Sequence, residues 1–325
     1  MTWSILGVDI AKESFQVCLL QADKMYNRTC RNETKGFATL DKWLAKHEVG
    51  QLHVCMEATG RYWEELALHL HQTGYTVSVV NPACIHNYAK SKLTRNKTDK
   101  LDAKVIAEYC ETQQPAAWTP PGPEVRELQA LVRHVDALQN MRTQEINRLA
   151  ARVPSSTVRD YLQEHITFLD EQLADLAQQV QAHIDHYPGL KKQRDLLDSI
   201  PGIGIVTAAK LLGENIQTFS STRALAAYAG LNPQLGDSGS SVRRKPRLSK
   251  IGNSGLRKAL YFPAISAKNH NPVIKAFCER LGERGKQTMV IIGAAMRKLL
   301  CLALGVLKSG QPFDPNYTQR RATTI

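Results

Sequence analysis

The sequence predicts a mixed α/β domain at the N-terminus, followed by a helical arm and a mainly helical C-terminal domain. Three observations support this. Strand-like apolar runs alternate with helical segments as far as residue 113. The stretch TPPGP at 119–123 is typical of a rigid linker, and a helical pattern with heptad spacing follows it. The predicted boundaries are 1–118 for the α/β domain, 119–187 for the linker and coiled-coil arm, 188–310 for the C-terminal domain and 311–325 for a polar, loosely ordered tail.

The composition indicates a globular and basic protein. Of the 325 residues 43% are hydrophobic, which suffices for two domains with a core in each. The 42 Lys and Arg against 30 Asp and Glu give a net charge of +12, which predicts a polyanionic partner such as nucleic acid. The seven cysteines are scattered without a CxxC pair, so neither a disulfide framework nor a zinc site is predicted. Without a leader or a run of about 18 apolar residues, we expect a soluble, cytoplasmic protein and no membrane contact.

Short apolar or alternating runs predict five strands in the first domain. They cover residues 4–10, 15–19, 27–33, 52–57 and 75–82. Helices are predicted at 37–47, 61–74, 83–92 and 99–113. Three strands followed by alternating helices and strands is the order of the ribonuclease H-like fold. In that topology the first and fourth strands are neighbours, so carboxylates near their ends share one edge of the sheet.

Four acidic residues are the candidate metal ligands. Asp9 lies inside the apolar run SILGVDI, where a carboxylate costs roughly several kcal/mol unless it is paired or metal-bound. Glu57 ends the fourth strand. Asp99 and Asp102 share the first turn of a helix that Thr98 can cap. One such aspartate would merely serve the helix dipole, but four carboxylates together favour Mg²⁺, which prefers oxygen ligands.

These four residues, called the tetrad below, also predict a type of chemistry. Two Mg²⁺ ions about 4 Å apart stabilise the attacking and leaving oxygens of a phosphoryl displacement. His53 is the only histidine close to these motifs, which disfavours a zinc hydrolase, and the lack of a Walker loop or GxGxxG motif disfavours nucleotide hydrolysis. Two further interpretations stay open. One is a metal-dependent, Holliday-junction-type nuclease, and the other is a non-catalytic nucleic-acid-binding scaffold whose acids only cap and pair.

The arm is predicted to be an antiparallel helical hairpin. Apolar residues recur along its first helix from Leu128 to Leu138, and the stretch VPSS at 153–156 breaks the helix, where Ser155 or Ser156 could cap the next one. The second helix carries a heptad seam. The hairpin is either packed within one chain or a dimerisation device, and the length of the seam favours dimerisation. The seam residues are Leu162, Ile166, Leu169, Leu173, Leu176, Val180 and Ile184.

The C-terminal domain begins after Pro188. The stretch IPGIG followed by a helix is typical of a helix-hairpin-helix, in which the amides around Gly202 and Gly204 would bind a backbone phosphate. A plain joint between two helices is the alternative. A further helical pattern, ALAAYAGL, leads into a loop rich in glycine and serine, and helices are predicted near 255–268, 272–282 and 287–308.

A basic segment follows that loop. From Val242 to Lys258 the chain has seven basic residues and no acid, and arginine suits forked contacts with phosphate. Together with Lys97, beside the acidic pair, these residues are the predicted nucleic-acid contacts. They are Arg243, Arg244, Lys245, Arg247, Lys250, Arg257 and Lys258.

The glycine- and serine-rich loop contains a candidate nucleophile. Gly236 and Gly239 flank Ser238 and free its backbone for close approach to a substrate. Such a loop is usually a flexible turn, but the neighbouring arginines favour a catalytic interpretation, with Ser240 and Ser241 as alternatives. A serine nucleophile keeps the phosphodiester energy in a protein–DNA ester, so strands can be rejoined without ATP. A metal ion or a carboxylate would activate the hydroxyl, and basic side chains would neutralise the phosphoryl charge.

The motifs of this chain resemble those of the DEDD transposases of IS110 insertion sequences, which are bridge-RNA-guided recombinases. The matching stretches run in the family's order over nearly the whole chain. They are GVDIAKE, MEATGRY, VVNPA, RNKTDKLDAK, IPGIG, AYAGLNP, DSGSSVRRKPRLSKIGN, LRKALY and GVLKSGQPFD.

The resemblance implies a RuvC-like domain, a coiled-coil arm and a transposase domain in a bacterial, nucleoid-associated protein. It implies that Asp9, Glu57, Asp99 and Asp102 form the family's Mg²⁺-binding tetrad and that Ser238 is the nucleophile of a covalent phosphoserine–DNA intermediate. It further implies donor and target DNA as substrates, a structured noncoding guide RNA, and a homo-oligomer. In that oligomer, a tetramer of two dimers, one subunit's tetrad meets another's serine.

Overall fold

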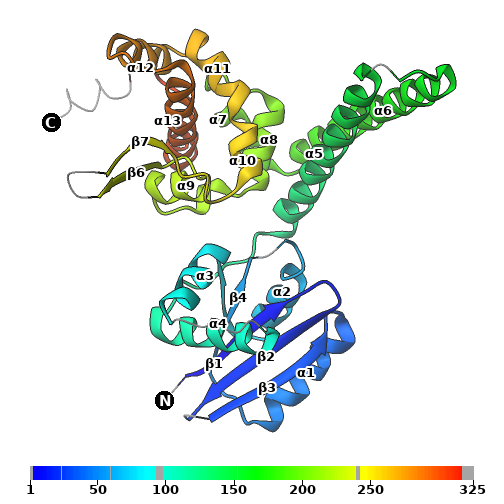
Figure 1. Ribbon diagram of the computed structural model, residues 1–325, viewed down its shortest axis with the longest axis vertical. Helices are drawn as coiled ribbons and strands as arrows, with labels where there is room; N and C mark the ends of the chain where they lie inside the picture. The colour runs from blue at the N-terminus through cyan, green and yellow to red at the C-terminus, as the bar shows by residue number, and fades with distance from the viewer. Residues whose placement is uncertain are drawn as a thin grey trace. The chain divides into compact units, whose positions relative to one another are not determined.

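The computed structural model describes residues 3–22, 24–58, 60–92, 98–151, 153–238 and 242–316, without the side chains of 235–238 and 242–246. It divides into two compact units, residues 1–120 and 121–325, which Figure 1 colours from blue to cyan-green and from green to red. Each unit is considered by itself. The separate predicted boundaries of the arm and of the C-terminal domain remain a prediction.

The first unit is built on a five-stranded mixed sheet. Its strands are β1 (Ser4–Ile10), β2 (Ser14–Gln21), β3 (Lys24–Arg31), β4 (Leu52–Glu57) and β5 (Thr76–Val80), in the order β3-β2-β1-β4-β5. Strand β1 pairs antiparallel with β2 and parallel with β4. The mixed sheet and the neighbouring first and fourth strands are therefore confirmed, and the order is consistent with a ribonuclease H-like domain. The last strand is shorter than predicted because Asn81 accepts a hydrogen bond from the Ala83 amide and so begins the next helix.

Helices cover both faces of this sheet (Figure 1). Helices α1 (Thr34–Lys46) and α2 (Glu64–Gln72) pack on one face, where Leu6, Val8 and Val17 are buried. Helices α3 (Pro82–Ser91) and α4 (Asp99–Gln113) pack on the other, over Ile5, Cys18 and Cys55. Because side chains alternate between the faces of a strand, the odd-numbered residues of β1 and β4 and the even-numbered residues of β2 lie on the α4 face.

Helix α4 approaches β1 so closely that only glycine fits beneath it. A Cβ atom on Gly7 would lie 2.2 Å from the Ala103 carbonyl oxygen and 2.3 Å from the Ala107 nitrogen. Further along α4, the buried Cys110 thiol is hydrogen-bonded to Cys55, which raises the pKa of Cys55 and lowers that of Cys110. His53 also contributes to the lowered pKa of Cys110. Cys110, near the C-terminal end of α4, lies beside Cys55 and His53 of β4, whereas Ala103, one turn after Asp99, lies over Gly7 of β1. The first turn of α4 is therefore on the side of the carboxyl ends of β1 and β4.

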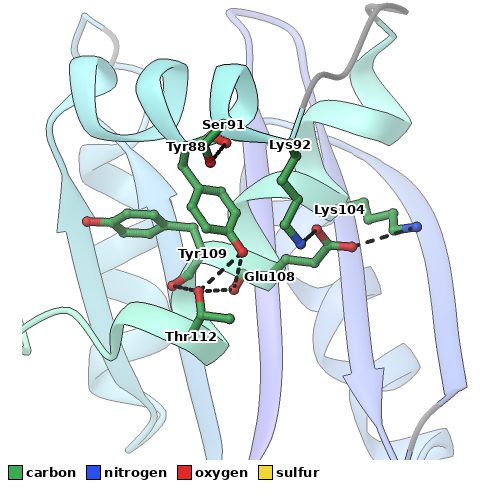
Figure 2. Close-up of polar contacts among 7 residues, drawn as sticks. All are labelled: Tyr88, Ser91, Lys92, Lys104, Glu108, Tyr109 and Thr112. Carbon is green, nitrogen blue, oxygen red and sulfur yellow. Dashed lines mark hydrogen bonds and ion pairs between the residues drawn. The ribbon is translucent and has the colours of Figure 1, made fainter.

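A polar network joins α3 to α4, as Figure 2 shows. The Lys92 ammonium lies 2.6 Å from one Glu108 carboxylate oxygen, and Lys104 lies 3.7 Å from the other. The Tyr88 hydroxyl donates to the Glu108 backbone carbonyl at 3.3 Å. The hydrogen bond to Glu108 raises the pKa of Lys92. These contacts hold the C-terminal end of α3 against α4.

The second unit begins with a helical hairpin of α5 (Pro123–Ala150) and α6 (Ser156–His186). The two helices run antiparallel, because His183 lies 2.7 Å from the Glu124 carbonyl oxygen while Arg142 pairs with Asp170. Ser155 caps α6 by accepting a hydrogen bond from the Val158 amide at 3.4 Å. The predicted seam residues are buried or half-buried along α6. The coiled-coil description and a pairing of two chains remain predictions.

Helix α5 belongs to two cores. Its first turns contribute Val125, Leu128 and Val132 to the main core of the unit, whereas Leu138 packs in a separate small cluster with Leu169 of α6. The remaining helices of the unit are α7 (Pro188–Asp198), α8 (Ile205–Gly213), the 3₁₀ helix η1 (Ile216–Thr218), α9 (Thr222–Tyr228), α10 (Ser254–Ala259), α11 (Tyr261–His270), α12 (Pro272–Glu283) and α13 (Thr288–Ser309).

Helix α13 lies at the centre of the main core of this unit. By length and composition alone it is apolar enough to cross a membrane, which the sequence analysis did not recognise, but 56% of its most apolar window is buried. Its buried residues, among them Leu299, Leu300 and Leu304, pack with residues of the helices around it. The apolar character of α13 is accounted for by this packing.

Three sequence predictions for this unit need correction. The predicted glycine- and serine-rich loop is a hairpin of β6 (Pro233–Ser238) and β7 (Val242–Leu248), described in the next subsection. The predicted helix 255–268 is two helices that meet at Leu260, because Pro263 has no amide hydrogen for the Ala259 carbonyl. The tail from Gln311 was expected to be loosely ordered, yet at its beginning Phe313 packs on the core and its amide donates to Ser199 Oγ at 2.8 Å; residues 317–325 of the predicted tail lie outside the described residues.

Replacing Gly7 tests the close approach of α4. We expect Gly7→Ala to lower the free energy of unfolding of the first unit by about 3 kcal/mol, because backbone atoms of α4 must move to admit the methyl group. All four tryptophans (Trp3, Trp43, Trp63 and Trp118) lie in this unit, so urea unfolding followed by tryptophan fluorescence reports on it alone.

The matched control is Gly50→Ala. No atom lies within 4 Å of a Cβ at Gly50, so this variant should unfold like the wild type. Equal stability of the two variants would contradict the packing constraint at Gly7.

Candidate functional site

Asp9 and Glu57 are neighbours on the α4 face of the sheet. The parallel register pairs Gly7 with Cys55 and Val8 with Met56, so the next position on each strand is a carboxylate. Both residues share the parity of Gly7 and Cys55 and therefore face α4. Both are half-buried. The predicted placement of these two acids at one edge of the sheet agrees with this register.

Asp99 and Asp102 occupy the first turn of α4. The Thr98 hydroxyl accepts a hydrogen bond from the Leu101 amide at 3.3 Å, so the predicted cap is confirmed. Asp99 is exposed and Asp102 is half-buried. Asp99 precedes Ala103 by one turn, on the helix side that lies against Gly7. The pair thus projects from the end of α4 that is directed toward Asp9 and Glu57.

The donor set fits magnesium in chemistry, since all four side chains offer carboxylate oxygens. Asp99 and Asp102 lie on α4, whose backbone packs directly on Gly7 of β1. The fold therefore places this pair on the same face of the sheet as Asp9 and Glu57. Within the part of the chain that the structure describes, however, no three His, Cys, Asp or Glu side chains gather closely enough to hold one metal ion. Lys97, predicted to contact nucleic acid, lies outside the described residues.

A polar residue that the sequence analysis did not select lies next to Asp9. Gln16 on β2 is directly opposite Asp9 in the antiparallel register and is only 6% exposed. The signal in the sequence is a single amide inside the run SFQVCLL, which is otherwise apolar after its first residue. Such a residue is usually taken for the solvent-facing position of a strand, whereas here both faces of the sheet are covered by helices.

Ser238 is the last residue of β6, and its backbone pairs with Val242 on β7. The alternatives Ser240 and Ser241 lie outside the described residues. The register places Arg243 opposite Asp237 and Arg244 opposite Gly236, so both arginines are on the strand that pairs with the serine's own. The sequence does not reveal this hairpin, because Pro246 lacks the amide hydrogen that a paired strand requires. Pro246 falls at the register shift between Gln234 and Gly236, where a missing amide hydrogen costs no ladder bond.

The root of this hairpin is held by close backbone contacts. The Ser249 amide donates to the Asn232 carbonyl at 2.9 Å, and the Asn253 amide donates to the Tyr228 carbonyl at 2.7 Å. A Cβ atom on Gly252, whose φ is +131°, would lie 2.2 Å from the Tyr228 carbonyl oxygen. The first contact closes the two ends of the hairpin on each other, and the other two tie the segment after β7 to the end of α9.

A side-chain network supports the same root. Asn253 Nδ2 donates to Glu214 at 2.7 Å and to the Tyr228 hydroxyl at 3.0 Å. The Tyr228 hydroxyl donates to Glu214 at 2.8 Å. Burial, followed by the Glu214 carboxylate, raises the pKa of Tyr228. The tyrosine therefore stays a neutral donor throughout the physiological pH range.

The predicted basic residues divide into exposed and engaged groups. Arg247 and Lys250 are exposed near the end of β7. Arg257 Nη1 donates to the Ala229 carbonyl oxygen at 3.0 Å, and Lys258 donates to Asn140 at 2.8 Å. The structure does not describe the side chains of Arg243, Arg244 and Lys245. Arg257 thus supports the hairpin root, and a phosphate contact from it stays a prediction.

The IPGIG turn links α7 to α8. Gly202 has φ +106°, and a Cβ there would lie 2.6 Å from the Ala267 Cβ, so packing against α11 already requires glycine. Gly204 is exposed at the N-cap of α8, where no side chain caps the helix. Phosphate binding at this turn remains a prediction, and the alternative of a plain helical joint has the packing of Gly202 in its favour.

Two stretches of the chain are similar to known transposases. A transposase model of the DEDD type from IS110 matches residues 6–157, and the model of the transposase IS116/IS110/IS902 family matches residues 194–279. The pilin gene-inverting protein of Moraxella bovis is 35% identical over 97% of this chain and 98% of its own length. The transposase of insertion sequence IS1111A from Coxiella burnetii is 27% identical over 82% of this chain and 78% of its own. The transposase of IS1328 from Yersinia enterocolitica is 25% identical over 79% and 81%.

Replacing Arg257 tests its assignment to the hairpin root. We expect Arg257→Ala to lower the free energy of unfolding of the second unit by about 1–2 kcal/mol, because a hydrogen bond from a charged group to a backbone carbonyl is lost. Thermal unfolding followed by circular dichroism measures this. Arg247→Ala is the control, since an exposed residue should change stability by less than about 0.5 kcal/mol. Wild-type stability in Arg257→Ala, together with weakened DNA binding, would assign Arg257 to phosphate contact instead.

Proposed function

This chain belongs to the IS116/IS110/IS902 family of transposases, and on that basis we propose how it recombines DNA. The protein cuts and exchanges strands at a donor and a target site through Ser238, with Mg²⁺ held by the tetrad. A structured noncoding bridge RNA, encoded by the element, guides the choice of sites. The observation that carries this proposal is that Asp9 and Glu57 directly follow the last paired residues of the neighbouring strands β1 and β4, on the face covered by α4, whose first turn carries Asp99 and Asp102.

The carboxylates are the proposed metal-binding residues. Asp9 and Glu57 would hold Mg²⁺ from the sheet, and Asp99 and Asp102 from the first turn of α4. Bound there, the metal would stabilise the charge that develops on the phosphoryl oxygens. The protein's own part is to hold its carboxylates at one edge, and the close contact of α4 with Gly7 supports that role. This arrangement also concentrates negative charge, which favours binding of a cation.

Ser238 is the proposed nucleophile. Its Oγ forms a bond to the phosphorus of one DNA strand, the bond to the leaving DNA oxygen breaks, and that oxygen takes up a proton. A carboxylate of the tetrad accepts the proton lost by the serine. The phosphoserine ester is later attacked by a DNA hydroxyl, which releases Ser238 and rejoins a strand without ATP. Arginines on the strand paired with β6 are suited to neutralise the phosphoryl charge.

A relative supports strand exchange over simple hydrolysis. The Moraxella bovis protein is described as inverting a pilin gene, and inversion requires that the cut strands be rejoined. Because that relative matches nearly the full length of this chain, we infer the same type of chemistry here. A Holliday-junction-type nuclease would use the same carboxylates with water and would leave the strands cut.

The proposed partners follow from the family and the charge. Donor and target double-stranded DNA are the substrates, and the net charge of +12 favours binding of both DNA and guide RNA. The tetrad and Ser238 belong to different units of the chain. We therefore expect a homo-oligomer, a dimer that forms a tetramer with both DNA sites, in which one subunit's serine serves another's tetrad.

Ser238→Ala tests the nucleophile. We expect this variant to bind DNA and guide RNA as the wild type does but to form no covalent protein–DNA adduct, because no hydroxyl remains to attack the phosphorus. Denaturing gel electrophoresis of labelled DNA detects the adduct. Ser240→Ala and Ser241→Ala are the controls and should retain it. An adduct that persists in Ser238→Ala would remove this residue from the mechanism, and normal cutting without an adduct would favour the hydrolytic nuclease.

Asp9→Asn tests the metal site. The change keeps the size of the side chain but removes its charge, and we expect DNA cleavage to fall about 100-fold or more because charge stabilisation at the reacting phosphate is lost. Chelation of divalent metal should have the same effect on the wild type, and added Mg²⁺ should restore it. Cleavage and exchange that continue under chelation would rule out the metal-dependent mechanism. Wild-type protein that never cleaves DNA would instead indicate a non-catalytic scaffold.

A further inference from the structure

We propose that Gln16 is a positioning residue for Asp9, so that the candidate metal site extends across a third strand. This inference rests on the proposed function, because it assigns Gln16 a role only if Asp9 holds a metal ion. The family's tetrad does not include this position. The observations that carry the inference are the register of the sheet, the burial of Gln16 and the state of its amide group.

The register aligns four polar residues in one row across the sheet. Thr29 on β3 is opposite Gln16, and Gln16 is opposite Asp9. Glu57 follows on β4, one position beyond the last paired residues of β1 and β4. All four share the face on which α4 packs, since side chains alternate along each strand. Directly opposed residues of antiparallel strands have Cβ atoms about 5 Å apart, which is within reach of a glutamine amide.

Only one end of the Gln16 amide is satisfied. Thr29 Oγ1 donates to Gln16 Oε1 at 2.5 Å. Gln16 Nε2 is buried and has no hydrogen-bond partner among the described residues. A buried donor without a partner costs about 1–3 kcal/mol. Because the oxygen and nitrogen of an amide lie on opposite sides of the group, the bond to Thr29 turns the nitrogen away from β3, toward the side of the row where Asp9 lies.

A purely structural role does not account for this arrangement. A glutamine kept for stability would have both ends of its amide paired, as buried polar groups generally do. An apolar side chain of similar length would fill the same space without the cost of an unpaired donor. The unpaired N–H is therefore the feature that requires an explanation, and the adjacent carboxylate supplies one.

The proposed action is the orientation of a ligand. When one oxygen of Asp9 binds a metal ion, Nε2 of Gln16 donates to the other oxygen and fixes the plane of the carboxylate. Hydrogen bonds of this kind to metal ligands typically change metal affinity about 10–100-fold. Thr29 contributes indirectly, because its hydroxyl sets the orientation of the Gln16 amide.

Gln16→Met provides the test, since methionine has a similar length and no amide. The probe is Mn²⁺ alone, added to the full-length chain, with free Mn²⁺ measured by electron paramagnetic resonance. We expect the variant to bind Mn²⁺ about 10-fold more weakly than the wild type and to unfold at the same temperature or a higher one. Unchanged Mn²⁺ affinity in a folded variant would overturn the inference, as would an effect confined to the KM for DNA.

Three further variants sharpen the result. Gln16→Glu keeps an acceptor for Thr29 but puts a second charge beside Asp9, so it should not restore the wild-type affinity. Thr29→Val keeps the amide and loses only its anchor, so it should weaken Mn²⁺ binding less than Gln16→Met does. Asp9→Asn should abolish the same binding. If Asp9→Asn binds Mn²⁺ like the wild type, the proposed metal site fails, whereas normal loss in Asp9→Asn with no effect of Gln16→Met rejects the role of Gln16 alone.

Discussion

The backbone of α4 rests on β1 at the one position of the strand where a side chain is missing. Because Gly7 has no side chain, the backbone of α4 at Ala103 and Ala107 can lie directly on β1. Asp9, two residues further along β1, faces the same helix, and the contact also sets the direction in which α4 begins. Nearer the opposite end of the helix, the buried thiol of Cys110 lies beside that of Cys55 on β4. Apolar packing thereby places one acidic pair, from the sheet, and another, from the start of the helix, on the same face in spite of the repulsion between their like charges.

The β6–β7 hairpin, which carries Ser238, is held by a similar close backbone contact in the second unit. Gly252 lies against the Tyr228 carbonyl as Gly7 lies against α4, and in both places the absence of a Cβ lets two backbones approach. The Asn253 and Arg257 side chains add directional bonds at the same root. Each proposed catalytic group thus projects from an element anchored by a glycine contact, which suits a reaction that requires groups on two units to meet reproducibly.

Much of the first unit follows from sequence patterns, because its central strands are buried and two of its helices, α3 and α4, begin at residues whose side chains cap them. The apolar run SILGVDI, which contains Asp9, predicts β1 with its bounds, and Thr98 predicts the start of α4. The β6–β7 hairpin could not be predicted, since Pro246 is tolerated only through an irregularity of register. Gln16 escaped notice because the burial of a polar residue depends on neighbouring strands and on the helix above. Ser238 was selected through its match to the motifs of a family. The similarity to known transposases confirms the family, and the role of Ser238 stays a proposal.

Helix α5 makes the arm mechanically part of the unit that carries Ser238. Its first turns lie in the main core, Asp136 is paired with Lys210 of α8, and Asn140 accepts a hydrogen bond from Lys258 of α10 before the helix continues outward along α6. A helix that is continuous over 28 residues acts as a stiff lever, so a load applied at the distal tip would be transmitted to α8 instead of being absorbed by a hinge. Shortening the arm without damage to the core therefore requires cuts beyond Asn140, with matched removal from α6.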